Sequence, residues 1–274
     1  MLGLGLRRRL RLLSIRSRAA LRERQRAVVL GRYARREQPL LEAARAAAKP
    51  PSADPLVTVT IATWNRAPIL ATRTIPALLR QTHANFEAII VGDCCSDDSA
   101  AVVASFGDPR LRFINLPERG RYPDDPFKRH CVAGSVPMMH ARSLAGGEWI
   151  AHLDDDEEWV PEHLELLLRR AMQTDAELVW GRARYETAPG EWLTQGNADM
   201  QAWDIPHSTV MMRSYLRLFQ ESMTSWRLAL GADHHRFRRM ALCGVRTAFV
   251  DEVITIGALR PGTTANWSKA EDIQ

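Results

Sequence analysis

The stretch WIAHLDDDEEWVPEH, Trp149 to His163, joins an apolar strand to a dense run of acidic residues. Five carboxylates follow one another directly: Asp154, Asp155, Asp156, Glu157 and Glu158. Neighbouring like charges repel, so the stability of the chain does not by itself explain such a run. A bound divalent cation would offset the repulsion, because hard cations prefer oxygen ligands. The stretch therefore predicts a cation site where an apolar strand ends.

The chain around this stretch alternates between strand and helix patterns. Apolar or β-branched runs predict strands over 57–63, 86–92, 111–116 and 149–153. Helical patterns cover 69–81, 100–106, 136–145 and the segment that starts at Pro161. This alternation predicts an α/β fold, with a mostly parallel central sheet and helices on both faces.

Polar residues stand at the carboxyl ends of three of the predicted strands. They are Thr63, Asn65 and Arg66 after the first strand, Asp93 after the second, and the acidic run after the fourth. Ligands of open parallel sheets bind beyond this edge. We therefore expect the acidic run to face a ligand site rather than an arbitrary part of the surface.

The net positive charge of the chain comes from its first 50 residues. Whereas the 274 residues carry a net charge of +5, residues 1–50 contain 14 Lys and Arg against three Glu, so the remainder is net negative. A body of this charge does not indicate nucleic acid binding, and we expect no nucleic acid partner. The four cysteines (Cys94, Cys95, Cys131 and Cys243) lack the spacing of a metal site and are typical of reduced thiols in a cytosolic protein.

The basic segment is rich in Leu, Ala and Arg, which predicts a helix from Leu2 to about Ala48. Three roles stay open for it: a basic helix on an anionic membrane surface, a docking helix for a partner, or a solvated extension. The sequence KPPSADP, Lys49 to Pro55, is typical of a linker. We expect a basic extension with linker over 1–54 and one domain over 55–274. No run of 18 apolar residues occurs, so we expect a cytoplasmic protein, with peripheral contact at the inner membrane face open.

Four sequence blocks, in order, resemble the family 2 glycosyltransferases, which have the GT-A fold. The blocks are TVTIATWNRAPIL, LLRQTHANFEAIIVGDCCSDDS, the segment from Glu118 to Leu164 that ends in the acidic run, and GADHHRFRRM. The resemblance covers roughly 57–264 and implies a nucleotide-sugar donor, usually a UDP-sugar. It also implies a divalent cation, Mn²⁺ or Mg²⁺, and inversion at the anomeric carbon. The acceptor would be a glycan, a lipid-linked sugar or a small molecule.

The resemblance also assigns roles to single residues. Asp93 matches the aspartate that binds the nucleotide base, and Asp154 and Asp156 match the two ends of the DxD motif, with Asp155 between them. Asp156 is expected to contact the metal directly, and Asp233 matches the general base. Thr63, Asn65 and Arg66 would shape the nucleotide pocket. The chemistry agrees, because a cation can neutralise a leaving diphosphate and a separate carboxylate must take the proton of the acceptor hydroxyl.

Several positions depart from the family pattern. Gly92 and Cys94-Cys95 replace the usual residues around Asp93; Met138-Met139, Ala232 and Arg260 stand in place of the usual Arg-Asn, Glu and His. These departures keep open a non-catalytic binding or scaffold protein on the same fold. Asp97 and Asp98 are interpreted as helix caps, and Trp64 and Trp159 as core or rim aromatics. His207 is expected either to line the site or to have a structural role.

Overall fold

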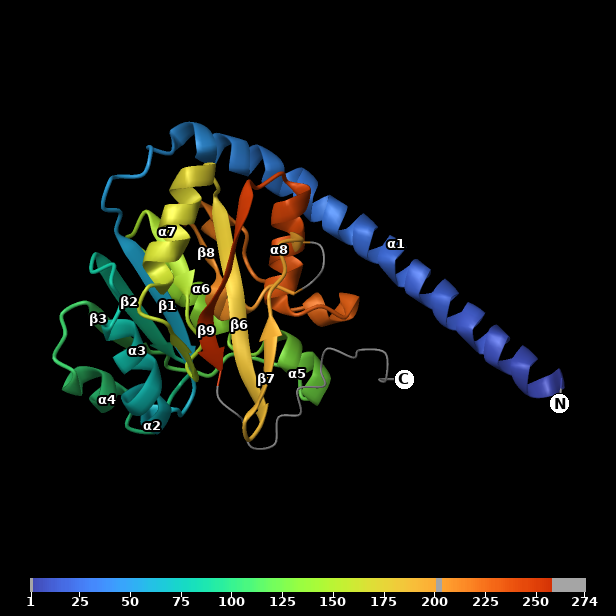
Figure 1. Cartoon of the computed structure of the whole chain (residues 1–274), viewed down its shortest axis with the longest axis horizontal. Helices are drawn as coiled ribbons and strands as arrows, with labels where there is room; N and C mark the ends of the chain where they lie inside the picture. The colour runs from blue at the N-terminus through green and yellow to red at the C-terminus, as the bar shows by residue number, and fades with distance from the viewer. Residues whose placement is uncertain (1, 201–203, 258–274) are drawn as a thin grey trace. The chain divides into compact units, whose positions relative to one another are not determined.

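A computed structural model describes residues 2–200 and 204–257 (Figure 1). Contacts divide the chain into two compact units. The sheet unit consists of Ala48–Arg121, Ala133–Arg217 and the chain from Val245 onward. The helical unit contains helix α1 (Leu2–Ala47), the segment Tyr122–Val132 and the segment Leu218–Gly244. Each unit is described by itself.

Four parallel strands form the first half of the sheet. They are β1 (Val57–Thr63), β2 (Phe86–Gly92), β3 (Leu111–Asn115) and β4 (Trp149–His152), in the spatial order β3-β2-β1-β4. Their bounds match the predicted strands within one residue. β1 and β2 are buried on both faces, as continuous apolar runs predict.

The second half of the sheet is mixed. The order continues β8-β6-β9-β5, with β8 (Met211–Arg213) antiparallel to both β4 and β6 (Leu178–Ala188). β6 runs parallel to β9 (Thr247–Gly257) and forms a hairpin with β7 (Glu191–Gln195). β9 pairs with β5 (Glu157–Trp159), a strand that the sequence patterns did not predict. Of the five acidic residues, Glu157 and Glu158 therefore belong to a strand, and Asp154 to Asp156 lie in the loop after β4.

The helices of the sheet unit follow the predicted alternation. They are α2 (Ala67–Ile69), α3 (Ile75–Leu79), α4 (Ser99–Ser105), α6 (Ser135–Ser143) and α7 (His163–Thr174). The helix predicted over 69–81 is instead three consecutive pieces, because a π-helical turn, Leu70–Thr74, separates α2 from α3. Pro76 has no N–H to donate to an α-helical bond, and Ile75 donates to the carbonyl of Leu70, five residues back. The helix predicted from Pro161 begins at His163.

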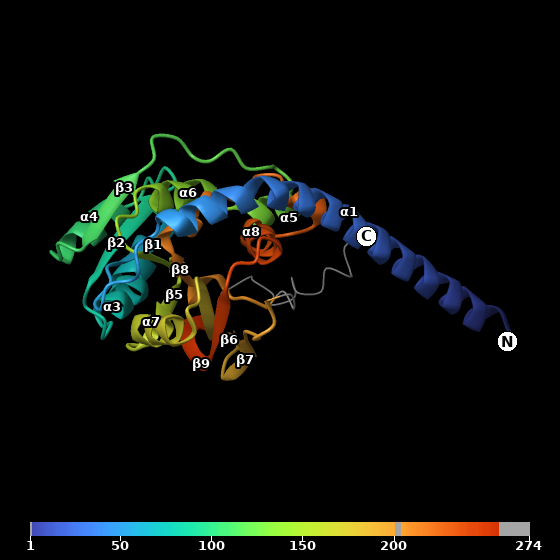
Figure 2. The ribbon, with the colours of Figure 1, turned by 90° about the horizontal axis from the view of Figure 1, so that it is seen from above.

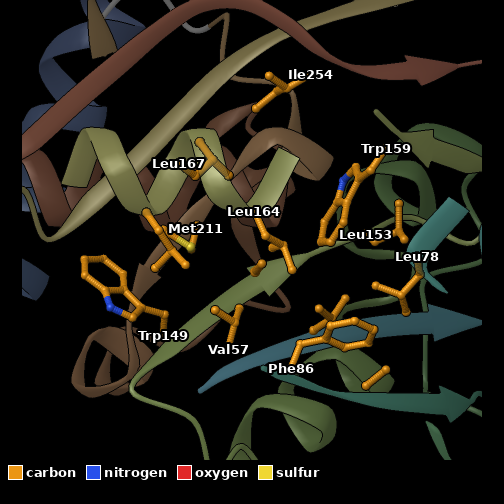
Figure 3. Packing of buried hydrophobic residues seen from close by; sticks show 14 of the residues in the cluster. Val57, Leu78, Phe86, Trp149, Leu153, Trp159, Leu164, Leu167, Met211 and Ile254 are labelled. Atoms are coloured by element: carbon orange, nitrogen blue, oxygen red, sulfur yellow. The ribbon is translucent and has the colours of Figure 1, made fainter. Parts of the chain in front are cut away.

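The core of the sheet unit lies between the sheet and helices α3 and α7. Figure 3 shows Leu164 and Leu167 of α7 pointing toward the strands that carry Val57 and Met211. Trp159 is buried in the same cluster, as the sequence analysis expected. Burial of each large apolar side chain contributes about 1.5–3 kcal/mol, so this cluster fixes the strand ends that carry the acidic loop.

The helical unit is built on the second half of α1. Leu30, Ala34, Glu37 and Leu41 form a buried stripe, and Glu37 makes an ion pair with Arg239 of α8 (Ala232–Leu242). Two arginines of α1 bind carbonyl oxygens of the unit: Arg26 Nε lies 2.7 Å from Leu228 O, and Arg45 Nη2 lies 2.7 Å from Gly244 O. Both views show α1 passing along α8 (Figures 1 and 2). The predicted helix is confirmed, but its second half is part of a folded unit rather than a solvated extension.

Among residues 2–200 and 204–257, no helix is long and apolar enough to cross a membrane.

One buried histidine makes the stability of the sheet unit depend on pH. His163 is fully buried, its ring stacks on Trp159 at 3.9 Å between centroids, and its Nδ1 lies 2.9 Å from Ile254 O. Burial lowers the pKa of His163 to about 3, although the bond to Ile254 opposes the shift. Between the ordinary pKa of histidine and this value, only the unfolded chain binds the proton. The His163 contribution is therefore present at neutral pH and is lost as the pH falls.

We expect the free energy of unfolding to fall by about 2 kcal/mol more in the native chain than in His163→Phe when the pH drops from 7 to 5. Denaturant unfolding at both pH values measures this difference, and exposed His140→Asn serves as the matched control. An identical pH dependence of the native chain and His163→Phe would contradict the assignment.

Candidate active site at the carboxyl edge of the parallel strands

The register of the sheet brings the predicted site residues of the sheet unit to one edge. Thr63, the last residue of β1, pairs with Gly92, the last residue of β2, and Asp93 N–H donates to Thr63 O at 2.8 Å. β4 pairs with β1 up to His152, and Leu153 links this strand to Asp154. Because these strands are parallel, Asn65, Arg66, Asp93 and the acidic loop all leave the sheet at this edge.

The acidic loop is flanked by basic side chains from two other segments. Arg66 Nη1, from the loop after β1, lies 3.6 Å from Asp156 Oδ2. His207 Nδ1, from the segment before β8, lies 3.3 Å from Asp154 Oδ1. The Asp156 side chain is 8% exposed, whereas that of Asp154 is 37% exposed. The two outer carboxylates therefore differ in environment, with Asp156 the more sheltered.

Asp155, the middle carboxylate of the loop, has a strongly raised pKa. Burial raises the pKa of Asp155 to about 6, and the charges of Asp156 and Asp154 act in the same direction. The Thr63 hydroxyl and Arg66 oppose this shift. The loop thus holds negative charge in a place where charge is costly, which is the situation a bound cation would relieve.

His207 and Ser208, just before β8, both contact Asp154 of the acidic loop. The Asp154 N–H donates to Ser208 Oγ at 2.9 Å, and the Ser208 carbonyl accepts from Trp159 Nε1 at 2.7 Å. The His207 ring stacks on His152, with 4.8 Å between centroids. Burial holds the pKa of His152 well below its usual range, and its Nδ1 lies 2.7 Å from Thr60 Oγ1. His207 therefore contacts the acidic loop through Asp154 and also packs within the sheet unit through His152.

Asp93 is held by a loop that the sequence analysis did not single out. Asp93 is 3% exposed, and its Oδ1 accepts from Gly120 N–H at 2.8 Å. Arg119 Nε lies 3.8 Å from Asp93 Oδ2, and the Arg119 guanidinium stacks 3.3 Å from the ring centroid of Trp64. Arg119 and Gly120 follow β3 at the same edge of the sheet, so the rule that pointed to the ends of the other strands could have found them.

The turn after β2 is tied to the loop after β1. Asn65 has a positive φ of 53°, and its Oδ1 accepts from Ser96 N–H at 2.8 Å. Asp97 Oδ2 accepts from Ala67 N–H at 2.9 Å, and Asp97 Oδ1 accepts from the Ser99 hydroxyl at 2.6 Å. These bonds hold the pKa of Asp97 below its ordinary value although burial acts against them. Asp97 thus contacts the first residues of α2 and α4, whereas Asp98 is the N-cap residue of α4 and makes no side-chain capping bond. The Asn65 side chain joins the two loops.

The departure at Gly92 has a structural reason. A Cβ at Gly92 would lie 2.6 Å from Asn115 Oδ1 and 2.9 Å from the Phe113 ring, so the position has no room for a side chain. Asn115 instead bridges the turn: its Oδ1 accepts from Cys95 N–H at 2.8 Å, and its Nδ2 donates to Cys95 O at 2.8 Å. Asn115 thus fixes the turn that carries Asp93 without a second carboxylate.

Asp233 belongs to the helical unit. It lies in the first turn of α8, whose N-cap is Gly231, and its Oδ1 accepts from His234 N–H at 2.7 Å. The pKa of Cys131 is raised to about 11, mainly by burial of the thiol and next by the negative charge of Asp233. Asp233 is therefore not the helix cap, and its carboxylate is partly exposed, at 28%. Arg260 lies outside the described residues.

The residues of the edge fit a cation that a substrate helps to hold. Within the described part of the chain, no group of three or more His, Cys, Asp or Glu side chains could hold a metal ion. Asp154 and Asp156 provide two separate carboxylates on one short loop. Mg²⁺ and Mn²⁺ suit this arrangement, because such ions are commonly held by one or two carboxylates together with substrate phosphates and water.

Comparisons with known proteins identify the family and the fold of the chain. The family model described as glycosyl transferase family 2 matches residues 58–123 and 135–230. WcaA of Escherichia coli K12, named for colanic acid biosynthesis, is 34% identical over 122 residues, which cover 44% of this chain and 39% of WcaA. The chain thus spans less than half the length of this relative.

Two solved structures share the fold. S. aureus TarS 1–349 in complex with UDP-GlcNAc has a TM-score of 0.57 at 15% identity, covering 76% of this chain and 60% of that chain. The mannosyltransferase PcManGT from Pyrobaculum calidifontis, in complex with GDP-Man and Mn²⁺, has a TM-score of 0.57 at 18% identity, covering 88% and 70%. The GT-A fold predicted from the sequence is therefore confirmed. Because the family model matches more than half of the chain and includes both Asp93 and the acidic loop, the chain belongs to glycosyl transferase family 2.

Proposed function

We propose that the chain is a metal-dependent inverting glycosyltransferase, which moves a sugar from a nucleotide-diphosphate sugar to an acceptor hydroxyl. The observation that carries the proposal is the acidic loop, Asp154 to Asp156, held between Arg66 and His207 at the carboxyl edge of the parallel strands. In this account Asp154 and Asp156 hold Mn²⁺ or Mg²⁺. When bound, the ion neutralises negative charge on the leaving diphosphate.

The nucleotide would be read at Asp93. A carboxylate oxygen accepts hydrogen bonds and the neighbouring Arg119 donates them, with 3.8 Å between Asp93 Oδ2 and Arg119 Nε. This pair favours a base that presents an N–H next to a carbonyl oxygen, as uracil and guanine do. The resemblance to the family implies a UDP-sugar as the usual donor, so we propose UDP as the nucleotide. Thr63 and Arg66 would line the phosphate side, and Asn65 would set the loop conformation.

We propose Asp233 as the general base that takes the proton of the attacking hydroxyl. In an inverting displacement the base acts from the side opposite the leaving group, so it must come from a different segment than the metal ligands. Support for Asp233 comes from the resemblance of GADHHRFRRM to the family's base block and from its partly exposed carboxylate. The family-model match ends at residue 230, before this block.

The alternative of a non-catalytic protein on the same fold rested on departures such as Gly92. That departure loses weight, because Asn115 performs the structural task at this turn.

Replacement of Asp156 by Asn should remove Mn²⁺-dependent binding of UDP. Isothermal titration of the full chain with UDP, with and without Mn²⁺, measures it. We expect Asp156→Asn to weaken UDP binding roughly tenfold or more in Mn²⁺, because a charged ligand of the ion is lost. Asp98→Asn, an exposed carboxylate of the neighbouring turn, is the matched control. Equal affinity of native chain and Asp156→Asn would remove the metal role of this loop.

Replacement of Asp233 by Asn should separate catalysis from donor binding. We expect the rate of UDP release from a UDP-sugar to fall by about 10²–10⁴-fold, while the affinity for UDP and Mn²⁺ is unchanged. Asp124→Asn, an exposed carboxylate of the same unit, should retain the native rate. Unchanged turnover in Asp233→Asn would show that another group is the base.

Peripheral membrane contact through the basic helix is a separate proposal. The second half of α1 packs on α8, so deletion of α1 would remove Glu37, leave the buried Arg239 without this ion-pair partner and confuse the test. The triple replacement of Arg7, Arg8 and Arg9 by Gln avoids this. We expect the native chain to co-sediment with anionic vesicles more strongly than the triple variant, by about 1 kcal/mol for each arginine that approaches the surface. Equal co-sedimentation of the two chains would contradict the proposal.

A further inference from the structure

Two cations of the helical unit are gathered on one aromatic ring. Trp226 lies in a short 3₁₀ helix, Ser225–Leu228, and Lys128 lies in α5 (Pro126–Val132). Lys128 Nζ is 4.8 Å from the centroid of the Trp226 ring, and the guanidinium carbon of Arg227 is 5.3 Å from the same centroid. Both distances are within the range of a cation–π contact. The ring therefore contacts two positively charged side chains, one from α5 and one from its own 3₁₀ helix.

Within residues 2–200 and 204–257, these two charges lack a carboxylate counterpart. Among the described residues, neither Lys128 nor Arg227 makes an ion pair with Asp or Glu. The neighbouring Arg129 differs, because its Nη2 lies 4.0 Å from an Asp124 carboxylate oxygen and its Nε donates to Pro123 O at 3.0 Å. Like charges repel, and the π electrons of one ring offset that repulsion only in part. An oxyanion would supply the negative charge that neither side chain finds among the described residues.

The pair of cations shares a packed cluster with the proposed base. Cys131, Val132 and Ala232 form the buried centre of this cluster, and Phe127 and Trp226 pack against it. Ala232 directly precedes Asp233, and the charge of Asp233 acts on the Cys131 thiol. The cations on Trp226 and the Asp233 carboxylate are therefore positioned by the same few side chains of one unit.

We propose that Lys128 and Arg227, fixed by Trp226, bind an anionic group carried by the acceptor. The acceptor would be an acidic saccharide, with a phosphate or carboxylate near the hydroxyl that receives the sugar. Trp226 acts as a positioning residue, because it holds the two cations rather than touching the reacting atoms. The identification of the ligand as the acceptor rests on the proposed function; the oxyanion site itself does not.

The test measures binding to the full chain without metal, in EDTA, so that the proposed donor site does not contribute. Three alkyl glycoside probes of equal chain length are compared: an N-acetylglucosaminyl diphosphate, a glucuronide, and an uncharged N-acetylglucosaminide. We expect the native chain to bind one charged probe roughly tenfold more tightly than the uncharged one, since each exposed ion pair contributes a few-fold. The charged probe that gains affinity identifies the oxyanion as phosphate or carboxylate.

The variants decide whether Lys128 and Arg227 are responsible. We expect Lys128→Gln/Arg227→Gln to bind charged and uncharged probes equally, and Trp226→Leu to lose most of the preference. Arg129→Gln, whose cation has its own partners, should keep it. A native chain without preference, or a preference that survives in the double variant, would overturn the proposal. So would a double variant that loses only binding to anionic vesicles, since the site would then serve a membrane.

UDP and Mn²⁺ titrations of the same variants keep the two hypotheses apart. Native donor binding in Lys128→Gln/Arg227→Gln, together with loss of the charged-probe preference, supports the acceptor site. If UDP binding falls with the double variant, the cations serve the donor and the proposal is wrong. If native chain binds no UDP but keeps the preference, the proposed function fails while the oxyanion site stands.

Discussion

Three neighbouring carboxylates, Asp154 to Asp156, leave the sheet where β4 ends, and the structure around them is arranged to tolerate their repulsion. Arg66 approaches Asp156 from one side and His207 approaches Asp154 from the other, while Ser208 accepts the N–H of Asp154. Burial raises the pKa of Asp155, and the charges of Asp156 and Asp154 add to this effect. An arrangement that costs stability without a ligand is understandable if a cation completes it.

The parallel alignment of β1, β2 and β4 turns this local feature into a site. The register that pairs Thr63 with Gly92 and Thr60 with His152 delivers Asp93, Arg66 and the acidic loop to the same edge. A slip of one residue in any of these strands would turn its side chains to the other face. The buried core between the sheet and α7 therefore specifies chemistry as well as stability, since it fixes the register.

Sequence patterns predicted the strands whose own residues specify them, and they missed the strand that forms only by pairing with a distant segment. The buried strands β1 and β2 carry continuous apolar runs, and their predicted bounds are confirmed. β5 was missed because Glu157 to Trp159 become a strand only through pairing with β9, about a hundred residues later. The same holds for the site: the acids were visible as a run, whereas the contact of Arg119 with Trp64 and Asp93 requires the fold. The reason for the departure at Gly92 also requires the fold, because the Asn115 side chain occupies the space that a side chain at position 92 would need.

The most direct test of the central claim is anomalous diffraction from crystals of the full chain grown with UDP and Mn²⁺. The account predicts one strong manganese peak at the edge of the parallel strands, about 2.1 Å from a carboxylate oxygen of Asp154 or Asp156 and in contact with the UDP diphosphate. Manganese bound away from both aspartates, or UDP bound at this edge with no ion on the acidic loop, would contradict it.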